Sequence, residues 1–205
     1  MGVKERRERH REGLRKVILD AARDLFVNEG YQNVSMRRIA QKIEYSPTTI
    51  YLHFKDKGDL LYQLCEETFR GLYAALRNFS VQESAADPLD LLRQGLRCYV
   101  EFGLQNPNQY RVTFMMGYSI DDPEGRSLDP ANPGMRAFAI LREGVEACIR
   151  QGKFRQADVE ATSQALWAAI HGITSLLIAN SRFPWVDKEK LVDLVIDTML
   201  AGLRA

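Results

Sequence analysis

The stretch from Ser35 to Leu60 restricts the fold of this chain more than any other, because it holds the start signals of two short helices joined by a tight turn. Ser35 is a favoured N-cap, and the apolar residues after it fall at helical spacing on one face. Ser46 is a second N-cap, followed by Pro47 at the first helical position, where its missing N–H costs nothing. The pattern predicts a first helix ending at Ile43 and a second through His53. The apolar face of the first helix holds Met36, Ile39, Ala40 and Ile43.

The second helix directs Ile50, and after it Phe54, towards the core and leaves a mainly polar face outward. Hydroxyl, phenol and imidazole groups on an exposed helix suit phosphate oxygens, base edges and thymine methyls. Two short helices in this arrangement indicate a helix-turn-helix reader of DNA, while a small helical subdomain whose polar face meets only water is the alternative. The outward residues are Thr48, Thr49, Tyr51, Leu52 and His53.

The order of residues decides between these interpretations. Ser35-x-Arg37-x-Ile39-Ala40, followed by Ser46-Pro47-Thr48-Thr49-Ile50-Tyr51-x-His53-Phe54-x-x-Lys57-x-x-Leu60, closely resembles the DNA-binding domain of TetR-type transcriptional regulators. The resemblance implies that the second helix meets the major groove or its phosphates, that Lys57 holds a phosphate, and that Arg37 reaches a guanine edge. The candidate DNA-binding residues are Ser35, Arg37, Pro47, Thr48, Thr49, Tyr51, Leu52, His53 and Lys57.

Two residues depart from the family pattern. Glu44 stands in the turn where the family usually has glycine, so a positive φ there would carry strain and change the turn. Arg38 stands where an acidic residue is common, which removes the reciprocal partner of a capping box from Ser35 and adds a cation near the expected DNA.

Charge is distributed unevenly along the 205 residues. Residues 1–60 hold 13 Lys and Arg against 9 Asp and Glu, a net +4, while the remaining residues hold 15 against 18, a net −3. A basic module joined to a slightly acidic one suits a DNA-binding protein, although chance could produce this difference. Within the basic end, residues 3–12 form a charged arm that either stays solvated or adds phosphate or minor-groove contacts.

The three cysteines show neither disulfide nor metal-ligand spacing, so we expect buried thiols and no metal site. No secretory signal is apparent, since the N-terminus is charged with no apolar region behind it, and the cytoplasm is the expected location. No nucleophile–base pair or phosphate loop is present, so the sequence predicts neither an enzyme nor a cofactor. The cysteines are Cys65, Cys98 and Cys148.

A first helix ending at Gly30 supplies the surface on which the two short helices pack. A long helix then begins at Lys57 with no linker before it, so it joins the DNA-binding end to the rest of the chain and is the expected lever between them. Residues 161–181 carry no charge, yet their polar side chains make a poor membrane span. With the last helix, after Asp187, they are expected to form a four-helix homodimer interface.

A weaker resemblance extends into the C-terminal part. Pro107-x-x-Tyr110-Arg111-x-x-Phe114 and Trp167-x-x-x-His171-Gly172 are similar to a TetR-type C-terminal domain that senses a ligand and dimerises. Core filling is the alternative for the first segment, and a hydrogen-bonded structural histidine is the alternative for His171. The resemblance implies these candidate ligand-binding residues: Tyr110, Phe114, Met115, Trp167 and His171.

The sequence therefore predicts an all-α protein with a three-helix N-terminal helix-turn-helix domain, residues 1–60, joined by a long helix to a helical ligand-binding and dimerisation domain, residues 61–205. The expected function is a ligand-responsive regulator, a repressor, which binds a palindromic double-stranded DNA operator as a homodimer. An apolar or aromatic small molecule is the expected effector, and no membrane is involved. The alternative is a helical carrier of small molecules with a non-functional DNA domain.

Overall fold

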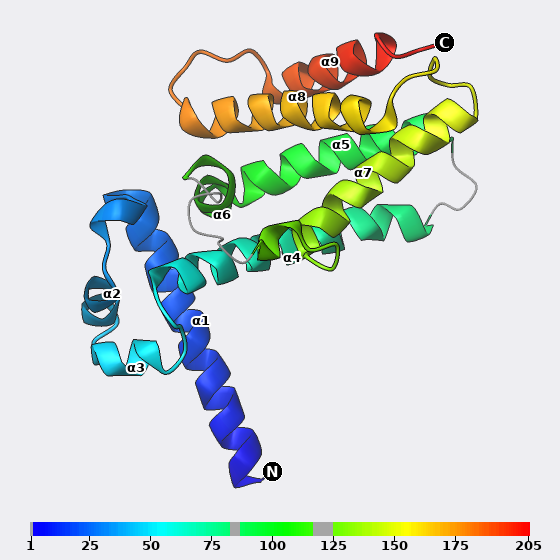
Figure 1. Ribbon diagram of the computed structural model, residues 1–205. Coiled ribbons are helices and arrows are strands. Elements are labelled where there is room, and N and C mark those ends of the chain that lie inside the picture. Colours follow the sequence, from blue (N-terminus) through cyan, green and yellow to red (C-terminus); the bar gives the residue numbers. More distant parts are fainter. Residues whose placement is uncertain (1, 83–86, 117–124) are drawn as a thin grey trace. The chain divides into compact units, whose positions relative to one another are not determined.

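The computed structural model describes residues 2–82, 87–116 and 125–205 (Figure 1). These residues are largely helical and contain no β-strand, so the all-α fold is confirmed. Two compact units divide the chain: Met1–Thr68 with Asn108–Glu124, and Phe69–Pro107 with Gly125–Ala205. The long helix α4 (Lys57–Gln82) contributes to both units. The domain boundary at residue 60 stays a prediction.

The first unit packs a helix-turn-helix pair on a long helix. Ile18, Ala22 and Phe26 are fully buried, because their spacing places them on one face of that helix. Gly30 ends the helix at φ +82°, a conformation that glycine adopts without strain. The elements of this unit are α1 (Val3–Glu29), the 3-10 turn η1 (Tyr31–Asn33), α2 (Met36–Lys42), α3 (Pro47–Tyr51), the start of α4, most of α6 (Pro107–Tyr110) and the π-helical η2 (Arg111–Met115).

The second unit is a helical bundle. Its interior is apolar, with side chains such as Leu96, Ile170 and Ile196 almost fully buried. Asp87 and Asp187 cap two of its helices, each accepting a hydrogen bond of 2.9 Å from a backbone N–H in the following turn. The elements are the rest of α4, α5 (Pro88–Gln105), the 3-10 turn η3 (Arg126–Leu128), α7 (Pro133–Arg150), α8 (Val159–Ala179) and α9 (Lys188–Ala201).

Ion pairs fasten α9 to α5 along one side. The Arg97 guanidinium lies against Glu189 and Asp193, and Arg93 pairs with Asp197 one turn away. Both arginines belong to α5 and all three carboxylates to α9. Within each helix these residues are four positions apart, so they lie on one face. The side of α9 that faces α5 is therefore charged at its edge and apolar at its centre.

Helix α8, which carries no charge after Glu160, packs within the second unit. Two of its buried hydroxyls are satisfied locally: Ser163 Oγ donates to the Val159 carbonyl at 2.7 Å, and Thr174 Oγ1 donates to the Ile170 carbonyl at 2.6 Å. Over the described ranges of the chain, no helix is both long and apolar enough to cross a membrane.

The cysteine thiols are free and buried, as expected. Burial raises the pKa of Cys65 to about 12, which keeps this thiol protonated and unreactive.

Candidate nucleic-acid interface and effector site

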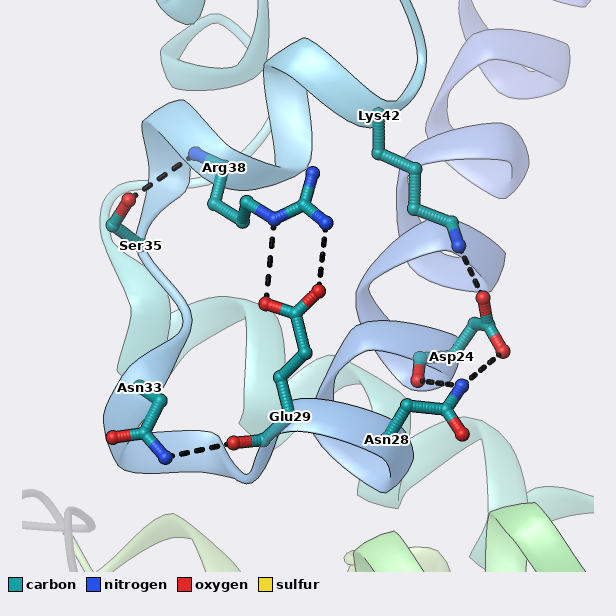
Figure 2. A network of polar contacts seen from close by, with 7 residues as sticks. All are labelled: Asp24, Asn28, Glu29, Asn33, Ser35, Arg38 and Lys42. Atoms are coloured by element: carbon teal, nitrogen blue, oxygen red, sulfur yellow. Dashed lines mark hydrogen bonds and ion pairs between the residues drawn. The ribbon is translucent and has the colours of Figure 1, made fainter.

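Helix α2 begins at the predicted cap and is fastened to α1. Ser35 Oγ accepts a hydrogen bond of 3.1 Å from the Arg38 backbone N–H. The Arg38 guanidinium donates to both carboxylate oxygens of Glu29, at 2.7 and 3.3 Å, and this bond raises the arginine pKa (Figure 2). Arg37, its neighbour, is exposed. Arg38 is thus paired with Glu29 within the protein, and its expected role as a cation near DNA stays a prediction.

Further polar contacts hold the two helices together. Lys42 at the end of α2 pairs with Asp24 of α1, and this hydrogen bond is the main cause that lowers the pKa of Asp24. Asn28 Nδ2 donates to the Asp24 side chain at 2.8 Å and to its carbonyl at 2.9 Å, while Asn33 Nδ2 donates to the Glu29 carbonyl at 2.8 Å (Figure 2). The position of α2 on α1 is therefore fixed at both ends of α2.

The turn between α2 and α3 has the strained shape expected from its sequence. Glu44 adopts φ +59°, the positive value that the family position normally gives to glycine. The next residue, Tyr45, donates its backbone N–H to the Ala40 carbonyl at 3.0 Å, which closes the turn. A glutamate in this conformation costs on the order of 1 kcal/mol.

Helix α3 presents the face that the sequence analysis assigned to DNA. Ser46 Oγ accepts from the Thr49 N–H at 3.2 Å and lies 2.9 Å from the Thr49 hydroxyl, so that hydroxyl takes part in the cap. Ile50 is fully buried, while 54% of Tyr51 and 72% of Leu52 are exposed. Thr48 is exposed as well, and Pro47 occupies the first helical position.

The end of α3 differs from the sequence prediction. The helix stops at Tyr51 rather than at His53, because the His53 N–H bonds three residues back, to the Ile50 carbonyl at 2.9 Å, and tightens the last turn. His53 is half-buried, and burial is the main cause that lowers its pKa, with the charges of Arg11 and Arg15 adding to the effect.

Lys57 opens α4 as expected and is already engaged. Its Nζ donates to the Tyr31 carbonyl at 2.8 Å and lies 4.3 Å from the centre of the Tyr31 ring. An ammonium group has three donors, so this contact positions the charge and leaves donors for a phosphate.

The candidate ligand-binding residues divide between the two units. Tyr110 is 1% exposed and its ring centre lies 4.7 Å from that of Phe114, while Met115 is 38% exposed. Burial of Tyr110 agrees with the alternative of core filling for that segment. All three residues belong to the first unit, whereas Trp167 and His171 lie on α8 in the second.

Trp167 and His171 form one cluster with two residues that sequence reasoning missed. Tyr99 OH accepts a hydrogen bond of 3.3 Å from Trp167 Nε1 and lies 3.4 Å from His171 Nδ1. Ser175 Oγ lies 3.3 Å from His171 Nε2. Burial lowers the pKa of His171, so the neutral imidazole is favoured. Ser175, one turn from His171, could have been found from its spacing; Tyr99, on α5, could not.

An aromatic wall adjoins this cluster. The Phe138 ring of α7 meets the Trp167 ring edge to face, with 6.1 Å between centres, and the Trp167 and His171 rings are 6.2 Å apart. Trp167 is 39% exposed, so it combines a stacking surface with an N–H already directed at Tyr99. Such a site can stack a flat or apolar molecule.

No group of three or more His, Cys, Asp or Glu side chains capable of holding a metal ion occurs within residues 2–82, 87–116 and 125–205.

A capped helix-turn-helix pair with an exposed second helix, followed by a helical bundle, defines the class of helix-turn-helix regulators. Residues 18–64 match the family described as "Bacterial regulatory proteins, tetR family", and residues 92–199 match "Tetracyclin repressor-like, C-terminal domain". The chain belongs to the TetR family of bacterial regulatory proteins, and the resemblance found in its sequence is confirmed. The family consists of transcriptional regulators and not of enzymes.

Individual relatives agree with this assignment. An HTH-type transcriptional regulator of Staphylococcus aureus (strain USA300) is 31% identical over 93 residues, which are 45% of this chain and 49% of that protein. The chain therefore spans about half the length of the curated relatives it matches. PfmR, a TetR family transcriptional regulator from Thermus thermophilus, is 26% identical with a TM-score of 0.71, over 92% of this chain and 99% of that one.

Two further solved structures share the fold. A tetR family regulatory protein from Rhodococcus RHA1 is 26% identical with a TM-score of 0.74, over 93% of this chain and 97% of that one. FadR from Bacillus subtilis, solved in complex with stearoyl-CoA, is 19% identical with a TM-score of 0.76, over 92% of this chain and 99% of that one.

Proposed function

We propose that this protein is a cytoplasmic repressor that binds a palindromic DNA operator as a homodimer and releases it when a small molecule binds the C-terminal part. The exposed face of α3 carries this proposal. Tyr51 and Leu52 are largely exposed although the opposite side of the helix, with Ile50, is fully buried. A rigidly held helix with an aromatic hydroxyl and a leucine facing outward is well placed for major-groove contact.

In this proposal α3 enters the major groove and α2 supports it. Arg37 is exposed and reads a guanine edge with its two-pronged guanidinium, whereas Tyr51 and Lys57 hold phosphates. The remaining contacts come from the rest of the outward face, with Ser35 and Ser46 keeping both helices capped. Two half-sites one DNA turn apart require recognition helices about 34–36 Å apart, which demands a dimer.

The dimer interface is assigned to α8 and α9. The side of α9 opposite its buried residues exposes Leu194, which is 63% accessible, and α8 exposes Leu176, which is 48% accessible. Residues of α8 that share the face of Leu176 are small and uncharged, so a second copy can approach closely. They are Ala161, Ala165, Ala168, Gly172 and Ala179.

The effector site is assigned to the aromatic wall of Phe138, Trp167 and His171. An apolar or aromatic molecule would stack on Trp167 and form hydrogen bonds with the linked side chains of Trp167, Tyr99 and His171. Binding releases DNA only to the extent that the molecule prefers a protein conformation in which the distance between the two recognition helices does not match the spacing of the half-sites.

The experiment that tests the function is fluorescence anisotropy of the purified protein with labelled DNA from upstream of its own gene. Excess unrelated duplex and about 0.15 M salt suppress non-specific binding, which depends steeply on salt. Saturation at one dimer per site is expected. Binding no tighter than to unrelated duplex, over the whole upstream region, would favour the alternative of a carrier protein.

The two tryptophans make the effector site testable by fluorescence. In Trp185→Phe, Trp167 is the remaining tryptophan and reports directly on the proposed wall. A molecule that releases DNA should quench or shift this emission in proportion to the DNA released. Release without any change in Trp167 emission would place the effector elsewhere.

A further inference from the structure

The first turns of α1 carry a row of cations on one face, which we call the basic stripe: Lys4, Arg7, Arg11 and Arg15. These residues are three and four positions apart, which is the spacing of side chains that lie above one another on a helix. Residues 3–12, expected from the sequence to form a charged arm that is either solvated or bound to phosphates, are a regular part of α1.

The basic stripe continues the face that α1 uses for packing. Three positions beyond Arg15 the same row reaches Ile18, then Ala22 and Leu25, which are 0%, 0% and 2% exposed. The face that is apolar and covered in the second half of α1 is thus cationic in the first half. Figure 1 shows these first turns extending past α3, away from α2 and α3.

The C-terminal end of the basic stripe lies beside the proposed recognition segment. The Arg15 guanidinium lies 5.5 Å from the centre of the Phe54 ring and donates to Gln63 Oε1. The charges of Arg11 and Arg15 also act on His53, the last outward residue after α3. The row of cations therefore begins where the α3 surface ends.

One acidic residue, Glu8, shares this side of α1, four positions after Lys4 and three before Arg11, so the stripe sets four cations against one carboxylate. Within the part of the chain that the structure describes, Lys4, Arg7 and Arg11 have no carboxylate partner, and all three are exposed. Arginines four residues apart on a helix repel one another. A polyanion placed along this face would relieve that repulsion.

We infer that the basic stripe is a second DNA-binding surface, which binds backbone phosphates flanking the half-site read by α3. From Lys4 to Arg15 the helix rises about 16 Å. Phosphates follow one another at about 3.4 Å of axial rise on each strand, so this length spans several of them. The inference rests on the proposed function, since it extends the same DNA contact.

A matched pair of double variants in the full chain tests the inference. Arg7→Gln with Arg11→Gln removes two charges from the stripe, whereas Arg6→Gln with Arg9→Gln removes two from the opposite face of the same helix. Both pairs change net charge equally and keep a residue of good helix propensity. Circular dichroism should report equal helicity, so any difference in binding reflects the face.

The readout is the slope of log affinity against log salt concentration, measured with short and with flank-extended duplexes. Removal of one cation that binds a phosphate should reduce the slope by about 0.9. The stripe variant should therefore show a slope smaller by about 1.8 per half-site and bind at least tenfold more weakly at about 0.15 M salt. Extending the flanks should strengthen binding of the wild type and of the Arg6/Arg9 variant, but not of the stripe variant.

The outcomes separate the inference from the proposed function. Equal slopes for the two double variants, with specific binding intact, would overturn the inference alone. Absence of specific binding by the wild type would overturn the proposed function, while the salt slopes on unrelated duplex would still decide the stripe, because non-specific binding is electrostatic.

Discussion

Arg37 and Arg38 are adjacent in sequence and have different surroundings in the first unit. Arg38 engages its guanidinium with Glu29 through two hydrogen bonds, whereas Arg37 is exposed on the same short helix. A guanidinium fork already occupied by a carboxylate cannot form the two-pronged contact that guanine requires. In the proposed function, base reading therefore falls to Arg37.

Replacing these arginines one at a time tests that assignment. Arg37→Ala should cost about 1–3 kcal/mol of operator affinity, concentrated at one base pair, because alanine cannot reach that base edge. Arg38→Ala should instead lower the thermal midpoint slightly and leave base preference unchanged. Affinity for a set of single-base operator variants measures both, and an identical preference in Arg37→Ala and wild type would exclude base reading.

His171 gives the second unit a dependence on pH. Burial lowers its pKa in the folded state below the unfolded value of about 6.5, so the folded protein prefers the neutral imidazole. The stability that this group contributes is present above about pH 6.5 and is lost as pH falls towards the lowered pKa.

The thermal midpoint should therefore fall between about pH 7 and pH 5, and less steeply in His171→Gln than in the wild type. His10→Gln is the matched control, because His10 is exposed on α1. A pH profile of His171→Gln that coincides with the wild type would show that the cluster with Tyr99 tolerates the charged form.

At the scale of single elements, α1 has two halves with different support. Its second half is anchored by buried side chains from Ile18 to Phe26, while its first half carries the basic stripe and contains Gly13 in the helix interior. Apart from its chain neighbours and the nearby backbone of its own helix, nothing lies within 4 Å of the position that a Cβ on Gly13 would occupy. Glycine in an exposed helix interior costs about 0.5–1 kcal/mol relative to alanine.

Gly13→Ala should therefore stabilise the first half of α1. Amide hydrogen exchange in residues 5–12 should slow about two- to fivefold, which corresponds to that free energy. Gly95→Ala in α5 is the control, because its Cβ is equally unobstructed but lies in the other unit. Exchange in residues 5–12 that is unchanged in Gly13→Ala would mean that Gly13 does not limit helix formation there.

At the scale of the whole molecule, the second unit leaves large apolar side chains exposed on helices whose other faces are occupied. On α9, one side packs through Val192, Ile196 and Leu200, and the adjacent carboxylates pair with α5, which leaves Leu194 outward. A homodimer would cover it and, in the proposed function, set the distance between the two recognition helices.

Leu194→Glu should convert the dimer into monomers, because each added charge would be buried against a second copy. Sedimentation velocity measures the change, and operator binding should fall with it. Leu128→Glu is the matched control, since Leu128 is 72% exposed on η3 of the same unit. A dimer that survives Leu194→Glu unchanged would remove α9 from the interface.

The sequence by itself determined the local features of this protein. Serine and aspartate caps, prolines at first helical positions and apolar spacing act over three or four residues, so they fixed the start of α2, α3, α5 and α9 without reference to the rest of the chain. The family motif and the turn at Glu44, with its positive φ, are also defined by residues close together in the sequence. The proposed contacts with DNA, effector and a second copy stay predictions.

Tertiary structure alone decided which polar groups are already engaged. Glu29 neutralises Arg38, Tyr31 positions Lys57, and Tyr99 joins His171 across 72 residues of sequence. Such pairings depend on how helices pack, and helix packing brings together residues whose separation in sequence carries no periodic signal.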